Sequence, residues 1–290
     1  MKVKPICFLC ASKQIYDVSN LLYKIEDDKF NFILKVNKKL LEIFRKDAVP
    51  TQIGTKLHRY IKLISKNEDP FKPLKNKSNE ISKKFYEILK EKLDQISSFE
   101  EKVKKAIFYA IIGNTIDFAA YNTSMDVSKF LEKDLNQKLR IDDRDKFLKD
   151  LQNARKIIYL LDNAGEIFFD KLLIELLSQK VKVYVVVKKK PILNDATYED
   201  AKLASLDKIK NVFLLDNGGD IIGIDLKALP EKTKKAWEES DFIVSKGMGN
   251  FESLSEYNLN KPIYYLLKAK CLPVAKELNV NKEDLICKRV

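Results

Sequence analysis

Three polar residues that could hold a divalent cation follow two neighbouring aliphatic segments of the chain. Asp162 and Asn163 come directly after one segment, and Asp195 follows the next. Together they offer two carboxylates and an amide oxygen, which are the hard oxygen ligands that Mg²⁺ and Mn²⁺ prefer. The single histidine, His58, lies far away in the chain, so a histidine-based zinc centre is excluded. The structural alternative is that Asp162 and Asp195 cap helices.

A lysine and two glycines follow a third aliphatic segment. Lys246 stands beside Gly247 and Gly249, whose backbone amides could form an anion-binding group at the start of a helix. A divalent cation, a lysine and exposed amides are together suited to binding and polarising a phosphoryl group. The sequence therefore predicts a site for a phosphorylated substrate.

The glycines of the chain gather around the same segments. Six of the eight glycines fall in loops after predicted strands: Gly165, Gly218, Gly219, Gly223, Gly247 and Gly249. Turns between strands and helices need small residues in any case. In a glycine-poor chain, however, this clustering indicates a backbone held close to a ligand.

The half of the chain after residue 150 alternates between short aliphatic runs and amphipathic segments. The predicted strands are 156–161, 181–187, 212–215, 242–245 and 263–267. Such alternation is typical of a doubly wound, mainly parallel sheet with helices on both faces, a three-layer α/β/α domain. Because ligands bind outside the carboxyl ends of the strands in such sheets, the polar loop residues are expected to meet there.

The first half of the chain has a helical pattern. Apolar residues recur at helical spacing in the segments 18–44, 55–65, 81–93 and 101–121. No strand is expected before Arg155. We therefore predict an all-helical region packed on the α/β domain, with a helical cap domain at 1–150 and an α/β metal- and phosphate-binding domain at 151–290.

The formal net charge is +12, which raises nucleic acid as a partner. Only six of the 54 basic residues are arginine, the residue that supplies most base and phosphate recognition. Lysines interspersed with acidic residues are instead typical of a solvated, thermophile-type surface. No apolar run approaches the ~20 residues of a membrane span, and no apolar signal core follows the first residues. We expect a cytoplasmic protein whose partner is neither nucleic acid nor membrane; the sequence does not indicate its oligomeric state.

Several motifs of the chain occur together in one known family. The second half contains DNAGE at 162–166, LNDAT at 193–197 and KGMGNFE at 246–252. The first half contains a C-x-x-C pair at 7–10, DPF at 69–71, SNE at 78–80 and GNTID at 113–117. With these motifs the chain resembles the damage-control phosphatase family, long labelled domain of unknown function 89. The likeness spans nearly the whole chain and is greatest to the compact archaeal and bacterial branch with paired N-terminal cysteines.

This resemblance implies a metal-dependent phosphatase that hydrolyses phosphate monoesters of small metabolites, including sugar phosphates and damaged phosphometabolites. It implies that Asp162, Asn163 and Asp195 hold a divalent cation such as Mg²⁺, Mn²⁺, Co²⁺ or Ni²⁺, and that Lys246 contacts the phosphate. The further substrate-site residues that it implies are Asn250, Glu252, Asn114 and Asp117.

Two mechanisms are open for such a site. In the preferred one, a metal-activated water attacks phosphorus while Lys246 stabilises the equatorial oxygens, and Glu166 or Glu252 moves protons. In the other, Asp162 attacks and forms an aspartyl-phosphate.

Cysteines form a separate group of candidate residues. Cys7 and Cys10 are a C-x-x-C pair, and Cys271 follows a predicted strand end near the expected site. A second metal site for a softer cation, or a redox function, is our hypothesis for these three residues. The alternative is buried thiols or a structural disulfide.

Two functions from other classes are alternatives to the phosphatase. One is an S-adenosylmethionine-dependent carboxyl methyltransferase, but the first strand of the α/β half is followed by a single glycine, Gly165, instead of a glycine-rich turn. The other is a non-catalytic RNA-binding protein, against which stands the lack of aromatic residues interleaved with arginine.

Overall fold

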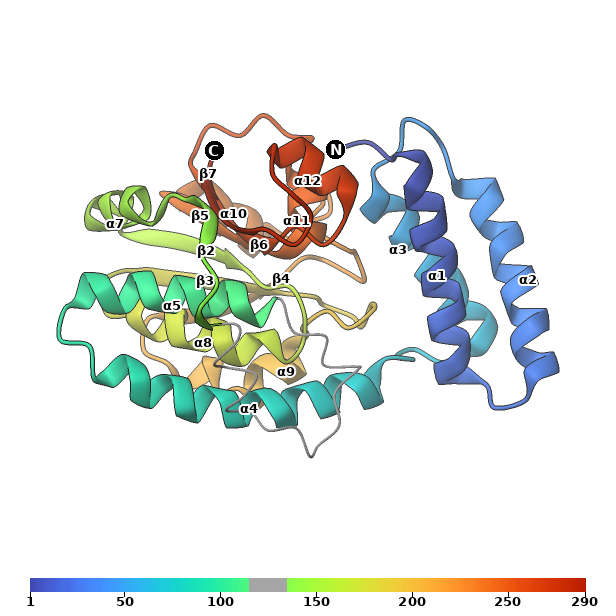
Figure 1. The fold of residues 1–290 in the computed structure, drawn as a ribbon, viewed down its shortest axis with the longest axis horizontal. Helices are drawn as coiled ribbons and strands as arrows, with labels where there is room; N and C mark the ends of the chain where they lie inside the picture. The colour runs from blue at the N-terminus through green and yellow to red at the C-terminus, as the bar shows by residue number, and fades with distance from the viewer. Residues whose placement is uncertain (115–134) are drawn as a thin grey trace.

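The structure is a computed structural model that describes residues 1–114 and 135–290. Within these residues a seven-stranded sheet carries helices on both faces, and a group of three N-terminal helices stands beside it (Figure 1). The predicted fold class, an N-terminal helical region with a mainly parallel three-layer α/β/α domain, is confirmed. No helix in the two described stretches is long and apolar enough to cross a membrane.

The sheet has the strand order β1-β7-β6-β5-β2-β3-β4. Its strands are β1 (Leu139–Asp142), β2 (Lys156–Leu160), β3 (Lys182–Val187), β4 (Val212–Asp216), β5 (Phe242–Lys246), β6 (Ile263–Lys268) and β7 (Leu285–Arg289). Every neighbouring pair is parallel except β6 and β7. The central strands are aliphatic and almost fully buried, as expected for a sheet covered on both faces. Because β2 lies between β5 and β3, the carboxyl ends of these three strands are adjacent.

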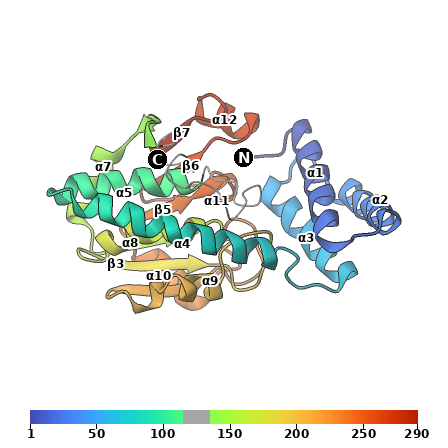
Figure 2. The same ribbon diagram turned by 60° about the horizontal axis from the view of Figure 1, so that its bottom comes forward.

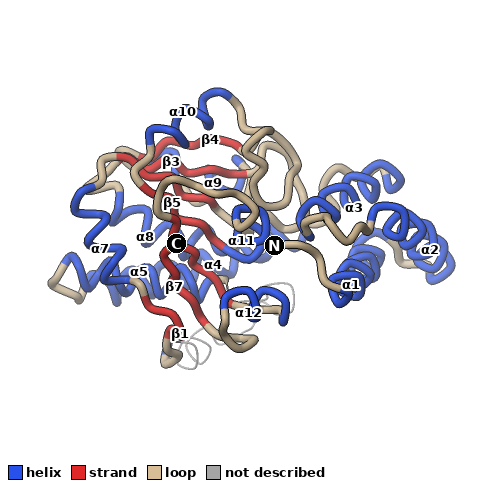
Figure 3. Tube along the Cα trace, turned by 90° about the horizontal axis from the view of Figure 1, so that it is seen from above, coloured by secondary structure: helices blue, strands red, loops and turns tan. Residues whose placement is uncertain are grey.

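Helices cover the two faces of the sheet (Figure 3). On one face lie α4 (Lys72–Asp94), α5 (Phe99–Gly113), α7 (Arg144–Asn153), α8 (Glu166–Leu177) and the short α9 (Tyr198–Leu203), followed by a 3₁₀ turn at Leu206–Lys208. On the other face lie α10 (Glu231–Glu239), α11 (Gly247–Leu254) and α12 (Leu272–Leu278).

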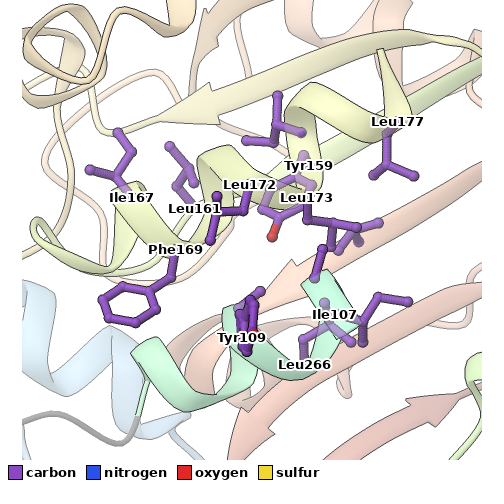
Figure 4. Packing of buried hydrophobic residues seen from close by; sticks show 14 of the residues in the cluster. Ile107, Tyr109, Tyr159, Leu161, Ile167, Phe169, Leu172, Leu173, Leu177 and Leu266 are labelled. Carbon is purple, nitrogen blue, oxygen red and sulfur yellow. The ribbon is translucent and has the colours of Figure 1, made fainter. Parts of the chain in front are cut away.

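Helix α5 packs closely on α8. Ile107 and Tyr109 of α5 lie near Phe169 and Leu173 of α8 in the largest hydrophobic cluster (Figure 4). A Cβ atom on Gly113 would lie 2.8 Å from Cγ of Phe169, so only glycine fits this crossing. The contact places the end of α5 directly over the loop that follows β2.

The first three helices have a hydrophobic cluster of their own. They are α1 (Pro5–Leu22), α2 (Glu26–Ile43) and α3 (Pro50–Ser65), and they lie together to one side of the sheet (Figures 1 and 2). Helices α4, α5 and α7, in contrast, share the hydrophobic cluster of β2, β3, β5 and β6. The division into domains at residue 150 stays a prediction.

Three sequence-based expectations need correction or restriction. The expected absence of strands before Arg155 is wrong, because β1 is an edge strand paired with β7. Its four residues include Arg140 and Asp142 and alternate in exposure, so no aliphatic run marks it. The predicted helix at 18–44 is two helices, since the chain leaves the helical conformation between Leu22 and Glu26. The expected extension of α5 to residue 121 falls mostly outside the described residues.

Candidate metal and phosphate site

The loops after β2 and β3 are joined by their backbones. The amide of Ala164 donates to the carbonyl of Asn194, and the amide of Ala196 donates to the carbonyl of Asp162, both at 2.8 Å. Asn163 and Asp195 form an isolated antiparallel bridge. The three predicted metal ligands, Asp162, Asn163 and Asp195, therefore come from two loops that hold each other in place.

A network of amides and carboxylates surrounds Asp162. Oδ2 of Asp162 accepts hydrogen bonds from Nδ2 of Asn114 at 3.1 Å and from Nδ2 of Asn163 at 3.0 Å. The same two amide groups donate to the carboxylate of Glu166, Asn163 at 2.6 Å. Oδ1 of Asn114 accepts from the backbone of Lys268, so this residue links the end of α5, the end of β6 and the site.

Lys246 lies beneath this network and is fully buried. Its Nζ contacts Oδ1 of Asp170 at 2.7 Å and Oε2 of Glu166 at 3.3 Å. Burial by itself lowers the pKa of Lys246, but the carboxylates of Asp170 and Glu166 outweigh it and raise the pKa above its usual range. The lysine therefore stays charged and compensates part of the negative charge of the neighbouring carboxylates.

Burial and mutual repulsion act on the acidic residues. Burial, together with the charges of Glu166 and Asp195, raises the pKa of Asp162 well above its usual range. Burial also raises the pKa of Asp195, against the attraction of Lys188, whose Nζ lies 3.4 Å from Oδ2 of Asp195. A cation between these carboxylates would favour their charged forms.

The charges of the cluster fit a divalent cation. The buried carboxyl groups of Glu166, Asp170 and Asp195 and the half-buried one of Asp162 stand with two contacting lysines, Lys188 and Lys246. If all four carboxyl groups are ionised, which a bound cation would favour, their formal charge exceeds that of the two lysines by two; Lys270 on the cavity wall adds a further positive charge near Asp162. Within the described residues no three side chains of His, Cys, Asp and Glu form a metal-binding group on their own. The two aspartates and Asn163 would thus be a partial set of oxygen ligands, completed by water and substrate.

A cavity of about 550 Å³ opens at this edge of the sheet. One side of the cavity is lined by the ends of β2, β3 and α5, through Asp162, Asn163, Asp195 and Asn114. The other sides are lined by residues of the N-terminal helices α1 and α3 and of α11. Its volume is within the usual range of small-molecule sites. The predicted ligand set therefore faces a space that could hold a metabolite.

The remaining predicted residues divide between the cavity wall and the layer behind it. Gly249 and Glu252 line the cavity, whereas Gly247 and Asn250 are buried. The amide of Asn250 donates to the carbonyls of Leu161 and Lys246, and this ties α11 to the ends of β2 and β5. The phosphate contacts assigned to these residues and to Lys246 stay predictions. Asp117 lies outside the described residues.

The three candidate cysteines line the same cavity with Glu252. Burial raises the pKa of the Cys271 thiol to about 11, and burial with the nearby Glu252 carboxyl raises the pKa of Cys10. Both are therefore protonated thiols at neutral pH in this arrangement. Burial likewise raises the pKa of Glu252 to about 7. The soft-metal or redox hypothesis for Cys7, Cys10 and Cys271 stays a hypothesis.

Sequence reasoning missed the side chains that hold the two loops from α4. Oδ1 of Asn79 accepts from the amide of Gly165 at 2.7 Å, and its Nδ2 donates to Oδ1 of Asp200 at 2.8 Å. Lys75, one turn earlier, forms ion pairs with Asp200 and Asp69. Asn79 and Asp69 belong to motifs quoted above. Only their burial in three dimensions reveals which loops they contact.

Comparison with known proteins places this chain in a family. The family model described as "Damage-control phosphatase ARMT1-like domain" matches residues 3–286. The chain belongs to this family. The family resemblance predicted from the motifs is therefore confirmed.

Relatives of this damage-control phosphatase family match the chain over nearly its full length. The "Damage-control phosphatase" of Archaeoglobus fulgidus is 37% identical, and the match covers 100% of this chain and 100% of that protein. "Damage-control phosphatase PH1575" of Pyrococcus horikoshii is 37% identical over all of this chain and 98% of its own length. "Uncharacterized protein MJ0202" of Methanocaldococcus jannaschii is 43% identical over 98% of this chain and 94% of its own.

A solved structure supports the fold independently. The crystal structure of the DUF89 family protein PH1575 from Pyrococcus horikoshii superimposes with a TM-score of 0.90 at 36% sequence identity. The match covers 100% of this chain and 99% of that one. The family fold therefore extends over both the N-terminal helices and the sheet.

Proposed function

We propose that this protein is a divalent-metal-dependent phosphatase that hydrolyses phosphate monoesters of small metabolites, such as sugar phosphates or damaged phosphometabolites. The observation that carries the proposal is the meeting of Asp162, Asn163 and Asp195 beside a metabolite-sized cavity, in a cluster of four carboxyl groups. The names of the relatives from Archaeoglobus fulgidus and Pyrococcus horikoshii support phosphatase chemistry.

Each part of the cluster has a task in this reaction. The bound cation, Mn²⁺, Mg²⁺, Co²⁺ or Ni²⁺, supplies Lewis-acid stabilisation of the phosphoryl group and activates water. Asp162, Asn163 and Asp195 hold it. Glu166, fixed by hydrogen bonds from Asn114 and Asn163, accepts a proton during attack.

The phosphate is held from the α11 side. The backbone amides at the start of α11, from Gly247 to Gly249, bind its oxygens, because a helix N-terminus favours anions. Lys246 adds positive charge from beneath while Asp170 and Glu166 fix its position. As the ester P–O bond breaks, the proton that Glu166 accepted passes to the leaving oxygen, and the alcohol departs into the cavity in front of the loops.

The test is a phosphatase screen over phosphate monoesters with each of the four cations, repeated with a chelator and on Asp162→Ala. We expect activity that requires a cation and falls at least about 100-fold in Asp162→Ala. The matched control is Asp17→Ala, an exposed aspartate of α1 that forms an ion pair with Lys13. Cation-dependent activity that survives Asp162→Ala would contradict the proposal.

Attack by water is favoured over attack by Asp162 itself. Oδ2 of Asp162 already accepts two amide hydrogen bonds, which reduce its nucleophilicity. Acid quenching during turnover, followed by a search for a labelled aspartyl-phosphate, separates the two mechanisms. Titration calorimetry with S-adenosylmethionine tests the methyltransferase alternative, for which we expect no binding.

A further inference from the structure

The two ends of the cavity differ in chemistry. The loops after β2 and β3 bring Asp162, Asn163 and Asp195 to one end. The helices and the segment before α12 bring mainly apolar side chains to the rest of the wall, and these include Ile6, Phe44, Ile53, Ile222, Met248 and Leu272. A phosphate bound at the acidic loops would therefore direct the remainder of its ester toward an apolar surface.

Few polar side chains line the cavity away from the acidic loops: besides the cysteines and Glu252 they are Gln14, Thr51, Lys270 and Lys282, and some are already engaged. Gln14 lines it, but its Nε2 points to Sγ of Cys10 at 3.9 Å and its Oε1 lies 3.3 Å from Nε2 of His58. The thiols of Cys7, Cys10 and Cys271 are weak hydrogen-bonding groups. A polyhydroxylated substrate would leave several hydroxyls without partners there, at a cost of about tenfold or more in affinity for each.

Among the described residues, Glu252 is the one carboxyl that lines the cavity away from the acidic loops. Its carboxyl faces the cavity and has no hydrogen-bond or ion-pair partner among residues 1–114 and 135–290. Its neighbours are the thiols of Cys10 and Cys271, whose pKa values its charge raises, and the amino group of Met1, whose charge acts against the burial that raises the pKa of Glu252. This half-buried carboxyl therefore lacks the donor that polar groups removed from bulk water normally have.

We propose that the cavity takes phosphate monoesters whose body is an apolar ring or chain carrying one hydrogen-bond donor, a hydroxyl or an amine, that meets Glu252. This substrate class rests on the proposed phosphatase function and narrows it away from polyhydroxylated sugar phosphates. Glu252 is then a specificity-determining residue that binds the far end of the substrate instead of the phosphate.

Two matched pairs of esters test the proposal on the metal-loaded full chain. Cyclohexyl phosphate and myo-inositol 1-phosphate have the same ring and differ in hydroxyl groups; we expect kcat/KM to be at least about tenfold higher for cyclohexyl phosphate. trans-4-Hydroxycyclohexyl phosphate adds one donor and is expected to exceed cyclohexyl phosphate. Equal values within the first pair, or a preference for the inositol ester, would overturn the proposal.

Variants of the cavity wall show which residues cause the substrate preference. Glu252→Leu should bring kcat/KM for the hydroxylated ring down to that for cyclohexyl phosphate, and Ile222→Ser should lower kcat/KM for cyclohexyl phosphate. Glu256→Leu is the matched control, because Glu256 forms ion pairs with Met1 and Lys2 outside the cavity lining. An unchanged advantage in a Glu252→Leu variant of normal melting temperature rejects the role of Glu252.

The outcomes separate this proposal from the phosphatase proposal. If every ester is hydrolysed without the expected preference, the substrate class is wrong and the phosphatase function stands. If no ester is hydrolysed with any cation, the phosphatase function fails. Calorimetric dissociation constants for the same esters then still measure whether the cavity prefers the apolar ring.

Discussion

A Cβ atom added to Gly247 would lie 1.9 Å from Oδ2 of Asp162, so the backbone after β5 is in direct contact with the carboxylate after β2. Gly247 also has a φ of +74°, which side-chain-bearing residues rarely adopt. Two strand ends thus meet at a point where only a hydrogen atom fits. The position of the main candidate metal ligand depends on this glycine.

Gly247→Ala should displace Asp162 and reduce activity strongly. We expect a fall of at least about tenfold in kcat/KM and a weaker apparent affinity for the cation, because small displacements of a ligand are costly. The control is Gly249→Ala, two residues along, where the nearest atom to an added Cβ is 3.4 Å away in Ile222. Steady-state kinetics over a cation titration compare the two; equal activities would contradict the prediction.

Asn79→Ala should loosen both acidic loops from α4. The amide of Gly165 and the carboxylate of Asp200 would each lose a buried partner, at a cost of about 1–3 kcal/mol in stability and 10- to 100-fold in cation affinity. Ser82→Ala on the same helix is the control, because Oγ of Ser82 is buried without a described partner. Urea unfolding and calorimetry with Mn²⁺ are the measurements. A loss in Ser82→Ala as large as in Asn79→Ala would argue against a specific effect.

Asp170→Ala should destabilise the protein more than any exposed ion pair can. Lys246 would keep its charge with only the longer contact to Glu166, and breaking a buried pair in this way costs about 3–5 kcal/mol. Tyr159 would also lose the acceptor of its hydroxyl. The exposed pair of Lys13 and Asp17 supplies the comparison, with a change of about 0.5 kcal/mol or less in Asp17→Ala. Similar unfolding free energies for the two variants would refute this prediction.

His58 should remain neutral down to acidic pH. Its burial, together with the charge of Lys62, lowers its pKa to about 4. The unfolded chain binds a proton on this histidine below about pH 6.5, whereas the folded chain does so only below about pH 4. The free energy of unfolding therefore decreases as the pH is lowered between these values, by about 2 kcal/mol from pH 7 to pH 5. NMR titration of the single histidine ring gives the pKa directly.

A variant checks the stability part of this prediction. His58→Gln should lack this share of the pH dependence, since glutamine does not titrate. Urea unfolding of both proteins at pH 7 and pH 5 is the measurement. A ring resonance that titrates near pH 6.5, or equal pH dependence in the two proteins, would contradict the assignment.

The parallel sheet was predictable because its central strands are aliphatic runs long enough to be read without a partner. Strands β1 and β7 were missed, since Arg140 and Asp142 give β1 a polar pattern and β7 has only three apolar residues before Lys288 and Arg289. The break between α1 and α2 was missed for a related reason. The apolar spacing continues across it, while the chain reverses to pack the two helices together.

The meeting of Asp162, Asn163 and Asp195 at one edge followed from the topology of parallel strands alone. The partners of these residues did not. Asn79 and Asp170 act through contacts with residues distant in sequence or on another element, and polar residues on a helix carry no signal of their partner. The burial of Lys246 was also unpredictable, because a lysine at the end of a strand can equally well face the cavity or lie behind it.

The pairing of β1 with β7 has a consequence for synthesis on the ribosome. Strand β1 emerges near the middle of translation, whereas β7, its neighbour in the sheet, is among the last segments made. Helix α5 likewise contacts β6 and β7, so part of its apolar surface is covered only when these late segments have been made. The nascent chain therefore exposes apolar surfaces to solvent until translation is nearly complete. The many lysines of the chain can reduce aggregation during that interval, because like charges repel one another.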